Sequence, residues 1–490
     1  MLNAKKLIQF STLYSIGNIA QSVISFFLLP IYALYLTPSD FGVVSLVTIT
    51  TSLITILINS PTSNALSRFY YKSNFKKDKL KLVFLLFIFT LIQSVFFGTI
   101  FFIISKQICI LILGEIKYLS LIKVYGVVIF LNPIANYFLT LLRISEKPLY
   151  FVLTNILSAL TVFFSVIYLL KHNYGVYGIA IGTVINSSFI IIAIIPVYLK
   201  SSKKSFNLKL LKKPLSFSYP LILSDYSQIL FESGDRYLLN ILLSLKEVGI
   251  YDIGYKLTGA FNFLISKPIS QSIEPMILKN EKNPNEIRTF LKKYATYYFL
   301  VGMFLALLAS LFSKEIISLV MHNNTDYLEA WKIIPILLFA NVIHGLGYFL
   351  GWGIIIREKS LLFSKIMIVS LLLNFALNII LIPHFGIIGA ALGTLLSYII
   401  WSILKMYYSA KYYELYFEIK RLIVIIFLSI FLYLVGAYFS RNDNYILNII
   451  SKIIVCSIYI SFFVFSRFLE NGEKAEIIEE IKSVVKKIKV

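Results

Sequence analysis

Apolar runs of about 20 residues recur along the whole chain, and short polar segments separate them. A run of that length spans the roughly 30 Å of bilayer hydrocarbon as an α-helix. The pattern contains about fourteen such runs and therefore predicts an all-α integral membrane protein. The runs begin near Leu7, Gly42, Lys81, Tyr118, Leu149, Gly175, Leu215, Val248, Ala295, Lys332, Leu361, Gly386, Leu422 and Ile446.

Two of these runs repeat one another. The segment YGVYGIAIGTVINSSFIIIAIIPVYLK from Tyr174 to Lys200 matches FGIIGAALGTLLSYIIWSILKMYYSAK from Phe385 to Lys411. A duplicated helical bundle in a membrane is typical of a transporter whose site lies between its halves. Because an even number of spans separates the copies, both halves are expected to enter the membrane in the same orientation, related by an axis along the membrane normal.

Composition supports the membrane assignment and identifies its sides. Apolar residues make up 58% of the chain, charged residues only 14%, and the formal net charge is +22. In a soluble protein that charge would suggest nucleic acid as a partner. Here most Lys and Arg residues fall in alternate loops, which excludes nucleic acid and predicts that both termini are cytoplasmic. The basic segments are Lys5 and Lys6, 68–81, Arg143 with Lys147, 200–213, 279–293, Arg357 with Lys359, 405–421 and the tail from Arg467.

Enzyme chemistry has no candidate residues in this sequence. It contains no Gly-Lys dipeptide for a phosphate-binding loop, and no GxSxG or HExxH motif. Cys109 and Cys456 lie in or beside apolar runs, without the paired spacing of a metal or redox site. We therefore expect a protein that is not an enzyme and needs no cofactor. The first apolar run, from Leu7 to Leu34, is too long for a signal peptide, and we expect it to be a retained helix.

Four segments in order resemble the polysaccharide-biosynthesis flippases, the O-antigen and capsule repeat-unit exporters of the multidrug/oligosaccharidyl-lipid/polysaccharide superfamily. The resemblance covers most of the chain. The segments are YLTPSDFGVVSL (Tyr35–Leu46), LSRFYY (Leu66–Tyr71), GDRYLLN with VGIYDIGYK (Gly234–Lys256) and NIILIPHFGIIGAALGTLLSY (Asn378–Tyr398).

The resemblance implies a fold like that of MATE transporters, with two six-helix lobes around a central cavity and alternating access between them. It implies a flippase that moves undecaprenyl-diphosphate-linked oligosaccharides across the bacterial cytoplasmic membrane, with a polysaccharide polymerase as the candidate protein partner. The expected divisions are an N-lobe over 1–200, a cytoplasmic linker over 201–214, a C-lobe over 215–411, a peripheral helix pair over 412–467 and an amphipathic tail over 468–490.

Polar residues at helical spacing predict the lining of the cavity, since polar groups inside a membrane avoid lipid. The first two helices carry neutral stripes that suit sugar hydroxyl groups, although small polar residues also let helices pack closely. Asn18 and Asn59 are the candidate sugar contacts. The stripes are Ser11, Ser15, Asn18, Ser22 and Ser25 in the first helix, and Ser45, Thr48, Ser52, Thr55 and Asn59 in the second.

The equivalent helices of the second half are charged. One face of helix seven carries Asp225, Gln228, Glu232 and Asp235 with Arg236 adjoining, and one face of helix eight carries Asp252, Lys256, Phe263 and Lys267. Each charge near a helix centre costs about 2.5–3.5 kcal/mol on the insertion scale, so these groups must pair, meet water or titrate.

Two interpretations of these charges stay open. In the functional one, Lys256, Lys267 and Arg236 attract the diphosphate, while Asp225, Glu232 and Asp252 couple transport to a proton or a sodium ion. In the structural one, they form ion pairs such as Asp252 with Lys256 at i,i+4.

Arg68 and Arg143 lie at the cytoplasmic ends of helices two and four, where a diphosphate would first arrive. Arginine binds phosphate oxygens in pairs, but topology alone also places basic residues there. A cation-coupled drug exporter, a peptidoglycan-precursor flippase and a scaffold without transport are the alternative functions. The mixture of Lys256 and Lys267 with the carboxylates favours a flippase over an exporter.

Overall fold

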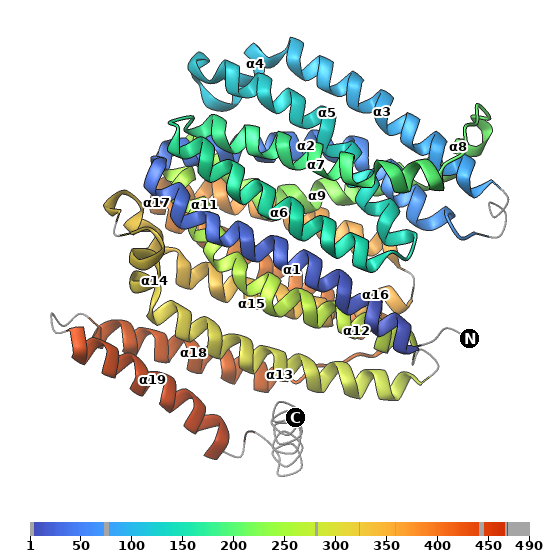
Figure 1. Ribbon diagram of the computed structural model, residues 1–490. Helices are drawn as coiled ribbons and strands as arrows, with labels where there is room; N and C mark the ends of the chain where they lie inside the picture. The colour runs from blue at the N-terminus through green and yellow to red at the C-terminus, as the bar shows by residue number, and fades with distance from the viewer. Residues whose placement is uncertain are drawn as a thin grey trace, which may run out of the picture.

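The structure, a computed structural model, describes residues 4–72, 78–279, 283–322, 324–357, 359–440, 445–465 and 468. Within these ranges the regular secondary structure is entirely helical (Figure 1). The all-α prediction is therefore confirmed. Of the predicted tail over 468–490, residues 469–490 lie outside the described residues.

The first seven α-helices pack around α5. This helix contacts α2, α3 and α7, while α6 packs against α1 and α7. Their bounds are α1 Ala4–Tyr35, α2 Pro38–Phe69, α3 Lys79–Ile103, α4 Ser105–Leu113, α5 Leu119–Ile144, α6 Pro148–Lys171 and α7 Val176–Ser201, with a 3-10 turn, η2, at Ile116–Tyr118.

The next group packs around α15 and α17, and α2 contacts it through α8, α9 and α11. Its elements are α8 Lys209–Ser218, α9 Leu221–Ser233, α10 Asp235–Leu242, α11 Leu245–Phe261, the π-helical η3 Asn262–Ser266, α12 Lys267–Lys279, α13 Pro284–Leu311, α14 Ser313–Val320, the 3-10 segment η4 Thr325–Lys332, α15 Ile334–Leu350, α16 Trp352–Ile356 and α17 Ser360–Tyr413. Finally, α18 (Ile419–Phe439) and α19 (Tyr445–Phe465) pack against α13 at the edge of the molecule (Figure 1).

The sequence repeat has the same backbone in both copies. Gly175 precedes α7 with φ 51° and ψ −133°, and Gly386 interrupts α17 with φ 58° and ψ −136°. Only glycine adopts such angles without strain, because a Cβ would collide with the backbone. The duplicated glycine therefore starts the same helix in each half.

Ten helices in the described part of the chain are long and apolar enough to cross a membrane. The predicted total of fourteen stays a prediction, and the difference has identifiable sources. The helix α17 joins two predicted spans across the break at Gly386. The second-half segments from Leu215 and Val248 are divided into shorter helices, and the first helix contributes the shorter apolar segment Ala20–Tyr35.

Two predicted continuous helices are divided into shorter elements. Helix seven is divided at Gly234, which keeps right-handed helical angles, and Asp235 at the start of α10 is buried against Arg236. Helix eight contains the π-helical turn Asn262–Ser266, which shifts the positions that follow. A π-helical turn inserts an extra residue into the helical register, so Lys267 does not continue the face of Asp252.

The predicted placement of Lys405 in a loop is wrong. The sequence groups it with the loop over 405–421, but the structure buries it inside the helical bundle. Its Nζ donates to the Gly347 carbonyl oxygen at 3.2 Å, and lies 3.4 Å from the centroid of the Trp401 ring. Because α15 ends at Leu350, this lysine satisfies a carbonyl group near the end of the helix.

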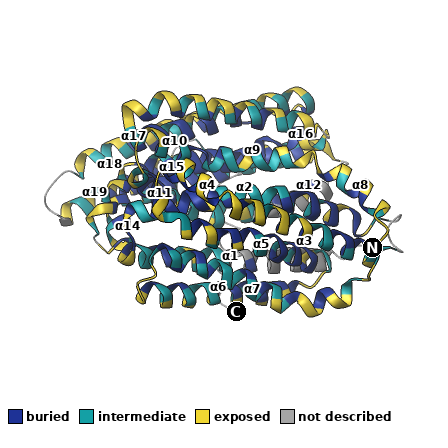
Figure 2. Ribbon diagram, turned by 90° about the horizontal axis from the view of Figure 1, so that it is seen from above, coloured by how far each residue is buried: buried dark blue, intermediate teal, exposed yellow. Residues whose placement is uncertain are grey.

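Large apolar side chains cover much of the outward surface of the bundle, as expected where lipid replaces water. Figure 2 shows exposed residues along the outer faces of the helices and buried ones between them. Lys452 on α19 forms an ion pair with Glu315 on α14, which ties the peripheral pair to the bundle.

Candidate functional site

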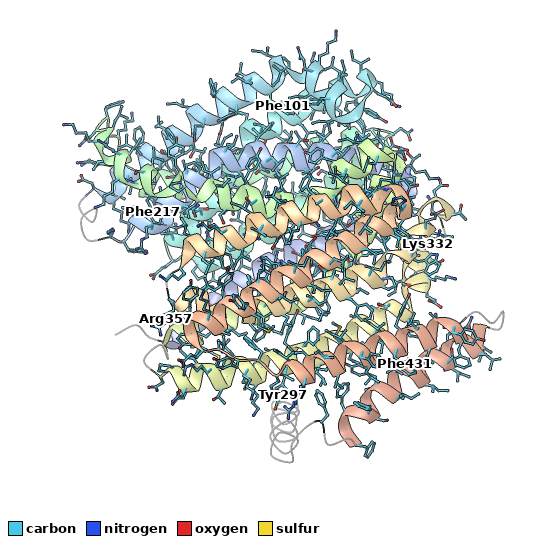
Figure 3. The ribbon with its side chains drawn as sticks, turned by 180° about the vertical axis from the view of Figure 1, so that it is seen from behind. Phe101, Phe217, Tyr297, Lys332, Arg357 and Phe431 are labelled. Carbon is cyan, nitrogen blue, oxygen red and sulfur yellow. The ribbon has the colours of Figure 1, made fainter. Side chains whose placement is uncertain are left out.

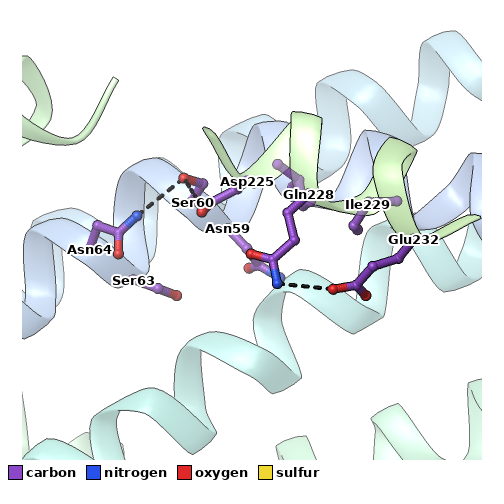
Figure 4. A pocket seen from close by; sticks show the side chains of 9 residues that line it. Asn59, Ser60, Ser63, Asn64, Asp225, Gln228, Ile229 and Glu232 are labelled. Atoms are coloured by element: carbon purple, nitrogen blue, oxygen red, sulfur yellow. Dashed lines mark hydrogen bonds between the residues drawn. The ribbon is translucent and has the colours of Figure 1, made fainter. Parts of the chain in front are cut away.

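A polar pocket of about 300 Å³ lies between α2 and α9 (Figure 4). These helices come from the two packing groups, so the pocket lies where the groups meet. Its lining residues are Ile56, Asn59, Ser60, Ser63 and Asn64 from α2, and Asp225, Gln228, Ile229 and Glu232 from α9.

Ser60 and Asp225 join the two walls of the pocket. The Ser60 hydroxyl donates to Asp225 Oδ2 at 2.6 Å and accepts from Asn64 Nδ2 at 3.2 Å. On α9, Gln228 Nε2 donates to Glu232 Oε1 at 3.1 Å. These bonds orient carboxylate and carboxamide groups, which can accept from and donate to a hydroxyl-rich ligand.

The lining is acidic, because Asp225 and Glu232 contribute carboxylates and none of the described lining residues is a Lys or Arg. Asn59 Oδ1 is buried without a hydrogen-bond partner. Lys267 lies within electrostatic range of Glu232 and is exposed, so it supplies positive charge next to the pocket. The site thus combines an acidic, hydrogen-bonding part with a nearby cation.

Arg236 forms the centre of a buried ion-pair network. Its side chain is 2% exposed, and it pairs with Asp235 at 2.6 Å and with Asp252 at 3.4 Å. The Tyr251 hydroxyl donates to the other oxygen of Asp235 at 2.6 Å, and Thr394 also contacts that oxygen. Asp235 thus has a structural ion-pair partner in Arg236, and this enclosure leaves Arg236 little access to a ligand.

Lys256 has a partner but keeps an exposed surface. Its Nζ lies 2.8 Å from Asp252 Oδ2, one helical turn earlier, as the structural interpretation predicted. The Lys256 side chain is 42% exposed, whereas that of Asp252 is 7% exposed. The ammonium also lies 4.4 Å from the centre of the Phe41 ring on α2. Asp252 is therefore enclosed by two cations, while Lys256 can meet a ligand.

Arg68 and Arg143 lie on the exposed surface at the ends of α2 and α5. The Arg68 guanidinium lies 5.8 Å from the centre of the Phe217 ring on α8. Arg68 follows Asn64 by one turn of α2, so it lies beyond the pocket toward that end of the bundle, here called the basic end. Figure 3 shows Phe217 and Arg357 at this end and Lys332 at the opposite one.

The neutral stripes are placed only in part. The Asn18 side chain lies outside the described residues. On α2, Thr48 bonds the Tyr125 hydroxyl at 3.3 Å, and the Ser52 hydroxyl donates to the Thr48 carbonyl, so these two groups bond within the protein. Only Asn59 of the predicted α2 stripe lines the pocket, together with residues that the prediction missed. The sequence feature that could have identified the missed residues is the polar pair Asn59-Ser60 followed one turn later by Ser63-Asn64.

At the end opposite Arg68, α2 and α11 cross with their backbones in contact. A Cβ at Gly42 would overlap the Leu245 carbonyl oxygen, and a Cβ at Gly249 would overlap the Pro38 carbonyl oxygen. Both helices start with a side-chain cap, in which Thr37 accepts from the Asp40 amide and Ser244 from the Glu247 amide. This crossing closes the helices together on the far side of the pocket from Arg68.

Comparison with known proteins agrees with this architecture. The sequence profile of a family described as "Polysaccharide biosynthesis protein" matches residues 31–330. The chain is 23% identical over 228 residues to the probable low-salt glycan biosynthesis flippase Agl15 of Haloferax volcanii, covering 46% of this chain and 47% of that protein. It is 26% identical over 384 residues to an uncharacterized membrane protein, MJ1068, of Methanocaldococcus jannaschii, covering 73% and 72%. The chain thus spans about half the length of the glycan flippase that it matches.

Solved structures share the fold. The lipid II flippase MurJ in an inward closed conformation superimposes with a TM-score of 0.74 at 18% identity, covering 92% of this chain and 98% of that one. The MATE transporter VcmN of Vibrio cholerae gives a TM-score of 0.58 at 16% identity, covering 84% and 96%. The predicted similarity to MATE transporters is therefore confirmed at the level of the fold.

Proposed function

Because the chain belongs to the polysaccharide biosynthesis protein family, we propose that it is a flippase for a lipid-linked oligosaccharide. In this proposal it moves undecaprenyl-diphosphate-linked repeat units from the inner to the outer leaflet of a bacterial cytoplasmic membrane, for O-antigen or capsule synthesis. Both termini and the basic end are cytoplasmic. A polysaccharide polymerase that uses the exported units is the proposed partner.

The observation that carries the proposal is the pocket between α2 and α9. Its carboxylates, carboxamides and hydroxyls are the groups that bind sugar hydroxyls, and it lies in a chain that otherwise presents apolar surface to lipid. We assign the glycan part of the substrate to Asn59, Asp225 and Glu232. An acidic lining repels a diphosphate, so the diphosphate belongs outside this pocket.

Exposed cations near the pocket suit the diphosphate. Lys267 lies within electrostatic range of Glu232, and Lys256 presents part of its ammonium between α2 and α11. Arg68 and Arg143 at the basic end are the proposed first contacts. Asp252 and Arg236 neutralise one another in the interior and thereby hold α10 against α11.

Alternating access would proceed by separating α2 from α11 at the Gly42–Gly249 crossing while the basic end closes. Export of a head with about two negative charges from a cell that is negative inside gains up to roughly 4.6 kcal/mol per 100 mV. The potential alone could therefore drive the cycle, and Asp225 and Glu232 would add coupling to a proton or a sodium ion.

A cation-coupled multidrug exporter is the second candidate, since an acidic lining without Lys or Arg also suits an organic cation. A peptidoglycan-precursor flippase would differ from the first proposal only in the sugar that is carried. The test is reconstitution of the purified protein in liposomes with a fluorescent undecaprenyl-diphosphate oligosaccharide. We expect the labelled glycan to exchange between leaflets only in liposomes that contain the protein. Uptake of an organic cation without glycolipid exchange would replace the flippase by the exporter.

A further inference from the structure

The segment from Lys203 to Lys213 joins the two packing groups and differs in character from the helices around it. It comprises a stretch without regular secondary structure and the first half of α8, at the basic end of the bundle (Figure 1). It carries five exposed lysines, Lys203, Lys204, Lys209, Lys212 and Lys213.

Two apolar side chains project from the same segment. The exposed fraction is 89% for Phe206 and 69% for Leu208. Burying such apolar side chains against other apolar groups is favourable. Exposed apolar side chains beside five cations are therefore suited to a surface that is both apolar and anionic. In a membrane protein, the boundary between headgroups and acyl chains provides one.

Among the described residues, no carboxylate pairs with the positive charge of this segment. The sequence contains no Asp or Glu between Glu146 and Asp225. Within the described ranges the five lysines form no ion pair, in contrast to Lys256 and Lys452, which do. This surface can therefore bind an external anion.

The other face of the segment is fixed to the bundle. Leu211, Pro214 and Ser218 of α8 are buried, and the Phe217 ring packs on Phe69 with centroids 5.9 Å apart. The Lys203 amide donates to the Leu80 carbonyl oxygen at 3.0 Å. The inner face of α8 is thus anchored, and the segment is held beside the end of α7 and the start of α3.

We propose that the segment from Lys203 to Lys213 is a docking surface for the anionic phospholipids of the leaflet at the basic end. Phe206 and Leu208 enter the boundary between headgroups and acyl chains, and the lysines bind phosphate groups of lipid heads around them. An anionic leaflet attracts each lysine near its surface, which supplies the charge complementarity. The surface fixes the linker between the two groups of helices to the membrane plane.

The test uses the full chain with Phe206→Cys, labelled with an environment-sensitive maleimide dye in lipid nanodiscs. Cys109 and Cys456 are buried, and the unmutated chain measures any labelling that they undergo. Bilayers of phosphatidylcholine, with or without about 30% phosphatidylglycerol, are compared, and brominated lipids serve as quenchers. We expect brominated lipids to quench the dye, and anionic lipid to increase quenching about twofold or more.

Two variants serve as controls. Replacing the five lysines by Gln in the labelled chain is expected to abolish the dependence on anionic lipid. Leu319→Cys places the dye on a side chain that is 80% exposed on α14, away from the linker, and its quenching is expected to be independent of lipid charge.

Emission typical of water at position 206, unchanged by lipid composition, would overturn the proposal. A response in neutral bilayers only after addition of undecaprenyl diphosphate would also overturn it, because the surface would then bind the carrier lipid. The measurement involves no transport, so a negative result leaves the proposed flippase activity standing.

Discussion

Gly42 and Gly249 occupy equivalent positions in two helices that cross, and each is packed against the backbone of the other's helix. Each lies five residues after its capping residue, Thr37 or Ser244. The crossing is thus built from one pattern used twice. It joins the two groups of helices at the end remote from Arg68.

Enlarging this contact should weaken it. In Gly249→Ala the new Cβ overlaps the Pro38 carbonyl oxygen, and such overpacking costs about 1–3 kcal/mol. We expect a lower midpoint of thermal unfolding in detergent and slower glycolipid exchange. Gly259→Ala is the matched control on the same helix, because its Cβ meets nothing within 4 Å and alanine favours helix. Equal behaviour of the two variants would show that the crossing is not tight.

Removing Arg236 should destabilise the fold. Arg236→Gln leaves the buried carboxylates of Asp235 and Asp252 without their guanidinium partner, which costs about 3–5 kcal/mol. The yield of monodisperse protein after extraction measures this loss. Asp235→Asn combined with Arg236→Gln should recover part of it, and no recovery would contradict the network.

Lys256→Ala should separate transport from stability. Asp252 keeps Arg236 as a partner in this variant, so we expect normal amounts of folded protein. Loss of a charge-assisted bond to the diphosphate, worth about 1.5–3 kcal/mol, should slow exchange about tenfold or more. Unchanged exchange would remove Lys256 from the substrate site and leave it only the pairing role.

The duplicated glycines should be equally intolerant of a side chain. Gly386→Ala forces a Cβ into a backbone region that glycine alone occupies readily, at a cost of about 1–3 kcal/mol. Gly175→Ala should lower the unfolding midpoint to a similar extent, because its angles are almost the same. Insensitivity of either site would argue against the shared backbone.

The carboxylates of the pocket should matter for transport and not for folding. Asp225→Asn keeps the shape of the side chain and a bond with Ser60 but removes the charge. We expect exchange to fall about tenfold, because a hydrogen bond to a charged acceptor is worth about 1.5–3 kcal/mol. Glu329→Gln, which removes an exposed pair with Lys332 far from the pocket, is the control and should leave exchange unchanged.

Features set by local sequence were predictable, and features set by distant contacts were not. The repeat at Gly175 and Gly386 could be recognised in the sequence because both copies need glycine at the same backbone angles. Asp225, Gln228 and Glu232 line one pocket, as their spacing predicted, because α9 is unbroken between them.

A distortion of helix eight caused one misplacement. Lys267 follows a π-helical turn, and the extra residue of that turn has no signature in composition. The burial of Lys405 depends on its contacts with Gly347 and Trp401. The charge pattern of the loops does not reveal these contacts. The Gly42–Gly249 crossing could not be predicted, because the cap-to-glycine spacing that the two helices share does not show that they touch.

The most direct test of the proposed function is the glycolipid pool of cells depleted of this protein. Mass spectrometry of the polyprenyl-diphosphate fraction would be combined with a reagent that reaches only the outer leaflet. We expect single repeat units to accumulate facing the cytoplasm and surface polysaccharide to fall, with restoration by the unmutated chain and not by Asp225→Asn. An unchanged pool with normal surface polysaccharide, together with altered tolerance of organic cations, would contradict the flippase assignment.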